Sequence, residues 1–142
     1  MAEPIPSTTT AELLGNRRRI LVTGGAGFIG GAVIRRLLRE SDSIVFNLDK
    51  MGYASDLTSI EKVLADLGEE DGYRHRLQRI DLNNAEAVEC AIREADPDLV
   101  MHLAAESHVD RSISGPGEFI TSNVTGTYNL LQAVRKHFEQ LT

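Results

Sequence analysis

The stretch Thr23-Gly24-Gly25-Ala26-Gly27-Phe28-Ile29-Gly30 decides the fold that this sequence predicts. It follows a short apolar run at residues 20–23 and opens a segment, residues 29–39, whose apolar residues recur at helical spacing. Glycines in such a turn permit positive φ angles and let a phosphate approach the backbone, where unpaired N–H groups and the helix dipole favour negative charge. The stretch therefore predicts a strand, a phosphate-binding turn and a helix in succession. An ordinary tight turn between a strand and a helix is the alternative interpretation.

Strands and helices alternate along the rest of the chain. Parallel strands need crossover connections that lie on the sheet, so this alternation predicts an α/β fold of Rossmann type, a parallel sheet with helices on both faces. Expected strands occupy residues 20–23, 44–48, 73–80 and 98–103, and expected helices occupy residues 29–39, 57–67, 83–95 and a long segment from residue 118.

The domain organisation follows from the same pattern. Residues 1–18 lack apolar periodicity and predict a flexible leader, whereas residues 19–142 predict one domain. A doubly wound dinucleotide-binding fold usually has six or more strands, and this chain ends on a helix after about four. We therefore expect the N-terminal, incomplete part of such a domain. The last helix carries more apolar side chains than one sheet face covers, which predicts an apolar patch that needs a partner.

Composition argues against several classes of protein. The 142 residues are 42% hydrophobic and 25% charged, which suits one soluble globular domain. The 15 basic and 21 acidic residues give a formal net charge of −6, which argues against binding nucleic acid through the overall field. The one cysteine, Cys90, suits a reducing, cytoplasmic setting and is expected to be a small buried hydrophobe. The sequence contains no apolar run near the roughly 18 residues that cross a bilayer.

Two acidic residues follow predicted strands. Asp49 stands 19 residues beyond Gly30, where dinucleotide-binding folds place a carboxylate that accepts hydrogen bonds from the adenosine ribose. It favours NAD over the 2′-phosphorylated form, although the adjacent Lys50 would soften the repulsion of that phosphate. A solvated turn residue is the alternative for Asp49. Asp81, after the third strand, is either a contact for the adenine edge or the N-cap of the next helix.

A rarer pattern lies just past the fourth strand, where open α/β sheets bind ligands. This string is Leu103-Ala104-Ala105-Glu106-Ser107-His108-Val109-Asp110-Arg111-Ser112. Together with the glycine turn, Asp49-Lys50-Met51-Gly52-Tyr53-Ala54 and Asn123-Val124-Thr125-Gly126-Thr127-Tyr128-Asn129-Leu130-Leu131, it resembles the extended short-chain dehydrogenase/reductases. The likeness is greatest to the members that dehydrate dTDP-glucose, and it covers residues 19–141.

The resemblance implies a cofactor, a substrate and the residues that hold them. Ser107 and Thr127 would approach the sugar nucleotide, dTDP-glucose. The chain departs from the family at Ser55-Asp56, where Gly-Asn is usual, and at Ser122, where Thr is usual; Asp56 would add negative charge near the cofactor's ribose. The residues implied for NAD are Gly24, Gly27, Phe28, Ile29, Gly30, Asp49, Lys50, Met51, Gly52, Asp81, Leu82, Leu103, Ala104, Ala105, Glu106, Ser107 and Ser122.

The reaction implied by the resemblance moves a hydride from C4 of the glucosyl ring to NAD, removes water across C5 and C6, and returns the hydride to C6. The family's base is the tyrosine of a Tyr-x-x-x-Lys motif. No tyrosine of this sequence has a lysine four residues later. We therefore expect no catalytic residue in this chain and no activity of the chain alone. The resemblance further implies a homodimer and a dTDP-rhamnose type of pathway.

Two alternative functions remain open. One is a UDP-sugar 4-epimerase, which shares the glycine turn but less of the string at residues 106–112. The other is a stand-alone dinucleotide-binding module without catalysis.

The charged residues of that string also allow two interpretations. Glu106, His108, Asp110 and Arg111 could form an acid–base centre, although a solvated or mutually paired cluster is the favoured interpretation. His102 and His108 have no further ligands at a clear metal-binding spacing, so no metal site is predicted.

Overall fold

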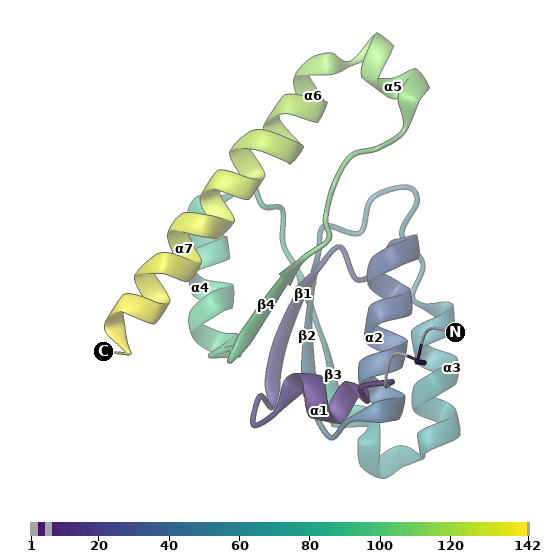
Figure 1. The fold of residues 1–142 in the computed structure, drawn as a ribbon. Helices are drawn as coiled ribbons and strands as arrows, with labels where there is room; N and C mark the ends of the chain where they lie inside the picture. The colour runs from purple at the N-terminus through teal and green to yellow at the C-terminus, as the bar shows by residue number, and fades with distance from the viewer. Residues whose placement is uncertain (1–2, 5–6, 142) are drawn as a thin grey trace.

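In the computed structural model, which describes residues 3–4 and 7–141, four parallel strands form one sheet in the order β3-β2-β1-β4 (Figure 1). The strands are β1 Arg19–Thr23, β2 Ile44–Asp49, β3 His75–Arg79 and β4 Leu99–His102. The helical elements are α1 Thr10–Leu14, α2 Phe28–Glu40, α3 Thr58–Leu67, the 3₁₀ helix η1 Glu69–Arg74, α4 Ala85–Ala95, α5 Val109–Ser114, α6 Pro116–Ile120, the π-helical turn η2 Thr121–Thr125 and α7 Gly126–Gln140.

Helices cover both faces of the sheet. Figure 1 shows α2 and α3 on one face and α4 and α7 on the other. Side chains alternate along β1, so Ile20 and Val22 join the core under α2 and α3, whereas Leu21 joins the core under α4 and α7. Each fully buried side chain of this size contributes about 1.5–3 kcal/mol to folding. The predicted fold class, a Rossmann-type sheet with two covered faces, is confirmed.

The stretch predicted as a leader contains a short helix, α1. Thr9 caps it: its side chain accepts from the Glu12 N–H, and the Glu12 carboxylate accepts from the Thr9 N–H. Leu14, at the end of α1, is buried in the core that lies under α2 and α3. The division of the chain at residues 18 and 19 stays a prediction, to which the structure adds this docked helix.

The long helix predicted from residue 118 is composed of three segments. It begins with Pro116 in the first turn of α6, passes through the π-helical turn η2 and continues as α7. At η2 the Gly126 N–H donates to the carbonyl of Thr121, five residues earlier. The helix α5, which precedes it, was not predicted, because α5 is six residues long and has no buried residue from which a period could be recognised.

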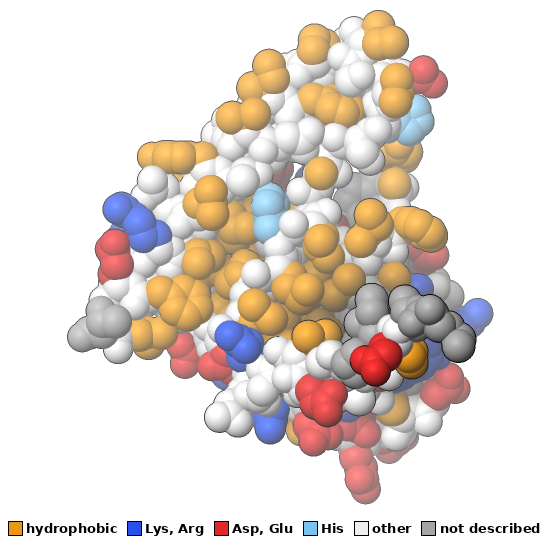
Figure 2. Space-filling view, in the orientation of Figure 1, with side chains coloured by type: hydrophobic (Ala, Val, Ile, Leu, Met, Phe, Trp, Pro, Cys, Tyr) orange, Lys and Arg blue, Asp and Glu red, His pale blue; other side chains and the backbone are white. Residues whose placement is uncertain are grey.

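Exposed apolar side chains follow this helical arm, and Figure 2 shows hydrophobic side chains gathered over it. Ile113, Ile120, Val124, Tyr128 and Leu131 are each at least 59% exposed. The predicted apolar patch is therefore present. Among the described residues, no helix combines the length and the apolar character needed to cross a membrane.

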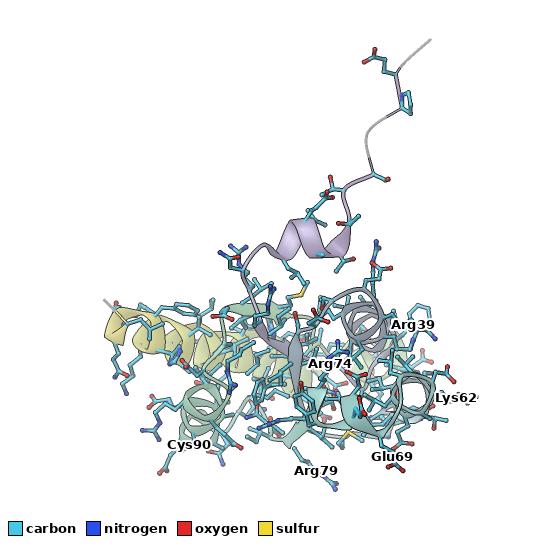
Figure 3. All side chains as sticks on the ribbon, turned by 90° about the horizontal axis from the view of Figure 1, so that it is seen from below. Arg39, Lys62, Glu69, Arg74, Arg79 and Cys90 are labelled. Atoms are coloured by element: carbon cyan, nitrogen blue, oxygen red, sulfur yellow. The ribbon has the colours of Figure 1, made fainter. Side chains whose placement is uncertain are left out.

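An arginine fixes the end of α2 against the sheet. Arg74 is 5% exposed and points inward between the helices and the sheet (Figure 3). Its guanidinium donates to the carbonyls of Leu38, Ser41 and Ser43 and pairs with Asp71 at 3.0 Å. The five N–H donors of a guanidinium suit this role, because the last carbonyls of a helix lack partners within the helix.

The expectation that Cys90 is buried is wrong. Cys90 is exposed on the outer side of α4 (Figure 3), where the Arg93 guanidinium lies 3.1 Å from its sulfur. The buried stripe of α4 consists of Val88, Ala91, Ile92 and Ala95. Position 90 lies outside this buried stripe and faces solvent.

Candidate functional site

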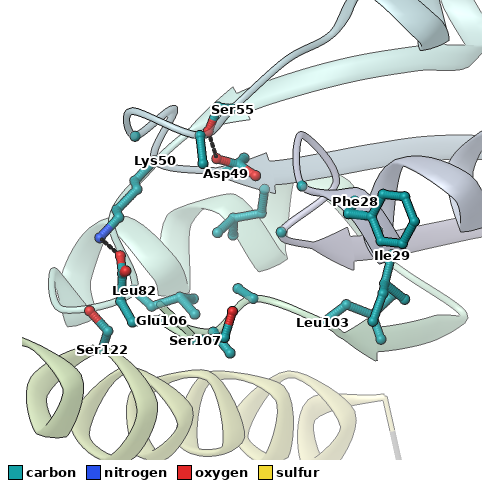
Figure 4. A pocket seen from close by; sticks show the side chains of 18 of the residues that line it. Phe28, Ile29, Asp49, Lys50, Ser55, Leu82, Leu103, Glu106, Ser107 and Ser122 are labelled. Atoms are coloured by element: carbon teal, nitrogen blue, oxygen red, sulfur yellow. Dashed lines mark hydrogen bonds and ion pairs between the residues drawn. The ribbon is translucent and has the colours of Figure 1, made fainter. Parts of the chain in front are cut away.

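A cleft of about 540 Å³ opens at the carboxyl ends of the strands (Figure 4). It lies where the strand order reverses, since β1 has β2 on one side and β4 on the other. Ligands of open α/β sheets bind at this switch point. The cleft has a β1–β2 wall, made of the glycine turn and the segment after β2, and a β4–α7 wall, made of residues 103–108 and Ser122.

The cleft brings together nearly all residues that the sequence analysis associates with the cofactor. The exception is Met51, whose backbone has a φ of 58° and which lies outside the lining. Thr127, expected near the substrate, also lies outside it. The predicted residues in the lining are Gly24, Gly27, Phe28, Ile29, Gly30, Asp49, Lys50, Gly52, Asp81, Leu82, Leu103, Ala104, Ala105, Glu106, Ser107 and Ser122.

Six further residues, which were not predicted from the sequence as part of the site, also line the cleft: Leu48, Tyr53, Ala54, Ser55, Ile80 and His108. Leu48 and Ile80 lie at or just beyond the ends of strands, so their place at the carboxyl edge of the sheet was a usable signal. Tyr53 and Ala54 belong to a motif of which only residues 49–52 were assigned to the cofactor.

The glycine turn is built by close backbone contact. Gly24 has a φ of 71°, and a Cβ there would lie 2.6 Å from the Cα of Ala104. A Cβ on Gly30 would lie 2.1 Å from the carbonyl oxygen of Gly24. Gly27, the N-cap of α2, offers no side-chain cap. The first N–H groups of α2 thus remain free for an anionic group in the cleft.

Asp49 ties the glycine turn to the segment after β2. One carboxylate oxygen accepts from the Ala26 N–H at 3.0 Å, and the other accepts from the Met51 N–H at 2.7 Å and from the Ser55 hydroxyl at 3.3 Å. The side chain is buried rather than solvated, being 8% exposed. A carboxylate has about four acceptor positions, so three internal bonds leave room for one ligand hydroxyl.

An ion pair joins the two walls. Lys50 Nζ lies 2.8 Å from Glu106 Oε1, and Figure 4 shows the two side chains reaching toward one another. The hydrogen bond to Glu106 raises the pKa of Lys50. Asn123, in η2, fixes the Glu106 backbone, since its Oδ1 accepts from the Glu106 N–H at 2.8 Å and its Nδ2 donates to the Glu106 carbonyl at 2.9 Å. The ion pair is therefore held from the β4–α7 wall.

A hydrogen-bonded relay runs beneath the cleft from β1 to the last helix. His102 Nδ1 lies 2.6 Å from the Thr23 hydroxyl, and its Nε2 lies 2.9 Å from the Thr127 hydroxyl. The Thr127 hydroxyl donates to the Asn123 carbonyl at 2.7 Å, so His102 Nε2 is the donor to Thr127. Burial lowers the pKa of His102, which favours this neutral form. Thr127 is thus occupied within the protein, which explains its absence from the lining.

Residues of the charged string past β4 contact the segment after β2. The Arg111 guanidinium lies 3.5 Å from the centroid of the Tyr53 ring, and the His108 ring meets the same ring edge-on with 6.4 Å between centroids. Since Glu106 pairs with Lys50, these side chains connect the two walls. The arrangement supports the paired-cluster interpretation over an acid–base centre.

Asp81 and Asp56 each accept a hydrogen bond from a backbone N–H two residues later. The N-cap of α4 is Asn84, not Asp81; the Asp81 carboxylate accepts from the Asn83 N–H and lines the cleft. Asp56 accepts from the Thr58 N–H at the start of α3 and lies outside the lining. Hydrogen bonds from the Thr58 side chain and backbone lower the pKa of Asp56. Its expected effect on the charge near the ribose stays a prediction. Within the described part of the chain, no three His, Cys, Asp or Glu side chains gather as a metal site would require.

The sheet order, the glycine turn and the acidic end of β2 around one cleft define a Rossmann-type nucleotide-binding protein. The family described as GDP-mannose 4,6 dehydratase matches residues 21–141. The chain belongs to this family, and the resemblance predicted from the motifs is confirmed.

Known relatives refine the comparison. The chain is 46% identical over 124 residues to a dTDP-glucose 4,6-dehydratase of Neisseria meningitidis serogroup B, covering 87% of this chain and 33% of that protein. A Bacillus anthracis dTDP-glucose 4,6-dehydratase solved in complex with NAD superposes with a TM-score of 0.68 at 29% identity, covering 84% of this chain and 34% of that one. A Thermus thermophilus UDP-glucose 4-epimerase complex with NAD gives a TM-score of 0.66 at 35% identity, with the same coverage. The chain spans about a third of the length of the curated relatives it matches.

Proposed function

We propose that this chain is the NAD-binding part of an enzyme that converts dTDP-glucose to dTDP-4-keto-6-deoxyglucose. The observation that carries the proposal is the cleft at the switch point of the sheet, in which the glycine turn, Asp49 and residues 103–107 meet. The 46% identity to a dTDP-glucose 4,6-dehydratase supports the sugar nucleotide.

Each part of the cleft suits one part of a dinucleotide: the pyrophosphate, the ribose or the adenine ring. Gly24 and Gly30 have no space for a Cβ, which brings the backbone within reach of a pyrophosphate above the uncapped start of α2. Asp49 keeps an acceptor position for a ribose hydroxyl. Ile80 and Leu82 give an apolar surface beside Asp81 that suits an adenine ring.

NAD supplies a hydride acceptor and donor when it is bound. The contribution of this chain is to bind and orient it: the glycine turn holds the phosphates, Asp49 holds the ribose, and Ser107 stands in the β4–α7 wall on the substrate side. We place the proton transfers of the dehydration on residues outside this chain and expect the chain alone to be inactive. The homodimer, the cytoplasmic location and the rhamnose-type pathway stay predictions.

The 35% identity to a UDP-glucose 4-epimerase favours one second candidate, an enzyme that oxidises and reduces C4 of a UDP-sugar. The same cleft would serve it, because the hydride chemistry at C4 is shared. The 46% identity to the Neisseria meningitidis dehydratase makes the dehydratase the preferred function.

Calorimetric titration of this chain with NAD, and then of the NAD-saturated chain with dTDP-glucose and UDP-glucose, tests the proposal. We expect saturable NAD binding and a preference for dTDP-glucose. Preference for UDP-glucose would favour the epimerase, and NAD binding without either sugar nucleotide would favour the non-catalytic module.

A further inference from the structure

Lys50 stands where a cation would attract a phosphate on the adenosine ribose. It directly follows Asp49, and dinucleotide-binding folds that accept the 2′-phosphate place a basic side chain near this point. In the structure the Lys50 side chain extends away from Asp49 and toward the opposite wall, where it meets Glu106 (Figure 4). The cation next to Asp49 is therefore turned away from the ribose position.

Glu106 is held in place more firmly than an ordinary surface carboxylate. Its side chain is 18% exposed, and its backbone N–H and carbonyl both bond to the Asn123 side chain. Asp81 and Glu118 add to the negative field at Lys50. The Lys50 side chain is 36% exposed, and pairing it with a fixed carboxylate costs less entropy than pairing two mobile side chains, which favours the engaged position of Lys50.

We propose that Glu106 is a specificity-determining residue for the dinucleotide: by holding Lys50 across the cleft, it leaves the ribose position facing only the carboxylate of Asp49, which rejects a 2′-phosphate. This inference rests on the proposed function, since it presumes that the cleft binds a dinucleotide. It assigns the choice of cofactor to a residue 57 positions from Asp49, on the other wall of the site.

Glu106→Gln tests the inference directly. The substitution keeps the shape and the backbone bonds to Asn123 but removes the charge that holds Lys50. Dissociation constants for NAD and NADP, measured by calorimetry on the full chain, are expected to show the affinity for NADP relative to NAD rising about tenfold. In the double variant Glu106→Gln, Lys50→Met, the gain in NADP affinity is expected to disappear, because no cation is left to be released.

Matched variants separate this role from general effects of charge. Glu89→Gln removes the partner of Lys136 in an ion pair of 3.0 Å between α4 and α7, away from the cleft, and is expected to leave both affinities unchanged. Glu106→Asp keeps the charge but shortens the reach to Lys50, so it is expected to gain part of the NADP affinity. Glu106→Asp also supplies the comparison if Glu106→Gln does not fold, which circular dichroism detects.

The outcomes distinguish the inference from the function on which it rests. NAD binding by the unaltered chain with an NADP-to-NAD ratio that Glu106→Gln does not change overturns the inference alone. A gain in NADP affinity that persists without Lys50 overturns it as well, because the effect would then come from net charge. Failure of the unaltered chain to bind either dinucleotide counts against the proposed function and removes the inference with it.

Discussion

The two walls of the cleft are built by opposite means. In the β1–β2 wall the glycine turn depends on the absence of side chains, because Gly24 and Gly30 bring backbone against backbone. The β4–α7 wall depends on side chains that are present, since Asn123 bonds the Glu106 backbone and the His102 relay supports Asn123. Substitution should therefore damage the first wall by adding atoms and the second by removing them.

The largest expected effect comes from adding one methyl group to the β1–β2 wall. Gly24→Ala introduces a Cβ at 2.6 Å from the Cα of Ala104 and forces a left-handed φ of 71° on an alanine. We expect the free energy of unfolding to fall by about 2–4 kcal/mol and NAD binding to be lost. Urea denaturation measures the first. The same change at Gly72, which has open space, should cost less than about 1 kcal/mol; equal losses at both positions would contradict this account.

A smaller loss is expected from removing atoms from the β4–α7 wall. Asn123→Ala deletes both bonds to the Glu106 backbone and should lower the free energy of unfolding by about 1–3 kcal/mol. Asn129→Ala is the matched control, because that side chain makes one bond, to the Leu82 carbonyl. Thermal denaturation compares them. Asn129→Ala should lose less stability than Asn123→Ala and, unlike it, should keep its NAD affinity. A larger loss of stability in Asn129→Ala would contradict this comparison of the walls.

The histidines predict how stability changes with pH. Burial lowers the pKa of His102 and of His75 below the ordinary 6.5, so the unfolded chain binds protons more readily than the folded chain. Stability is therefore complete above about pH 6.5 and falls as the pH drops below it, by at most about 1.4 kcal/mol per pH unit for each group.

Urea denaturation at about pH 7.5, 6.5 and 5.5 measures this slope. His102→Gln and His75→Gln should each flatten it, and only the first should alter NAD affinity, because His102 alone supports Thr127 in the relay. A slope that His102→Gln leaves unchanged would show that the relay does not require the neutral ring.

The smallest effect is expected where the two walls touch over the cleft. Tyr53→Leu removes the ring under the Arg111 guanidinium. The free energy of unfolding should fall by about 0.5–1 kcal/mol, which is the contribution of an exposed cation–π contact. Tyr53→Phe keeps the ring and should cost less. Proteolysis of the segment after β2, followed over time, reports local opening; identical rates for both variants would assign the contact no role.

The sequence located the residues of the two walls better than the contacts between them, for a physical reason. The glycine turn, Asp49 and the strand ends are set by short-range backbone rules, so spacing alone located them. The ion pair of Lys50 with Glu106 and the bonds of Asn123 join positions 56 and 17 residues apart, and no local period encodes such contacts. The same limit applies to α5 and to α1, which are too short to show a periodic apolar face.

The π-helical turn sets the angular phase of the last helical arm. The turn Thr121–Thr125 closes its hydrogen bond over five residues instead of four, so the apolar period of α7 does not continue unbroken into the residues before it. Leu130 and Ala133 can then face the sheet while Asn123 faces Glu106. The site therefore depends on a helix whose two halves do not share one α-helical period.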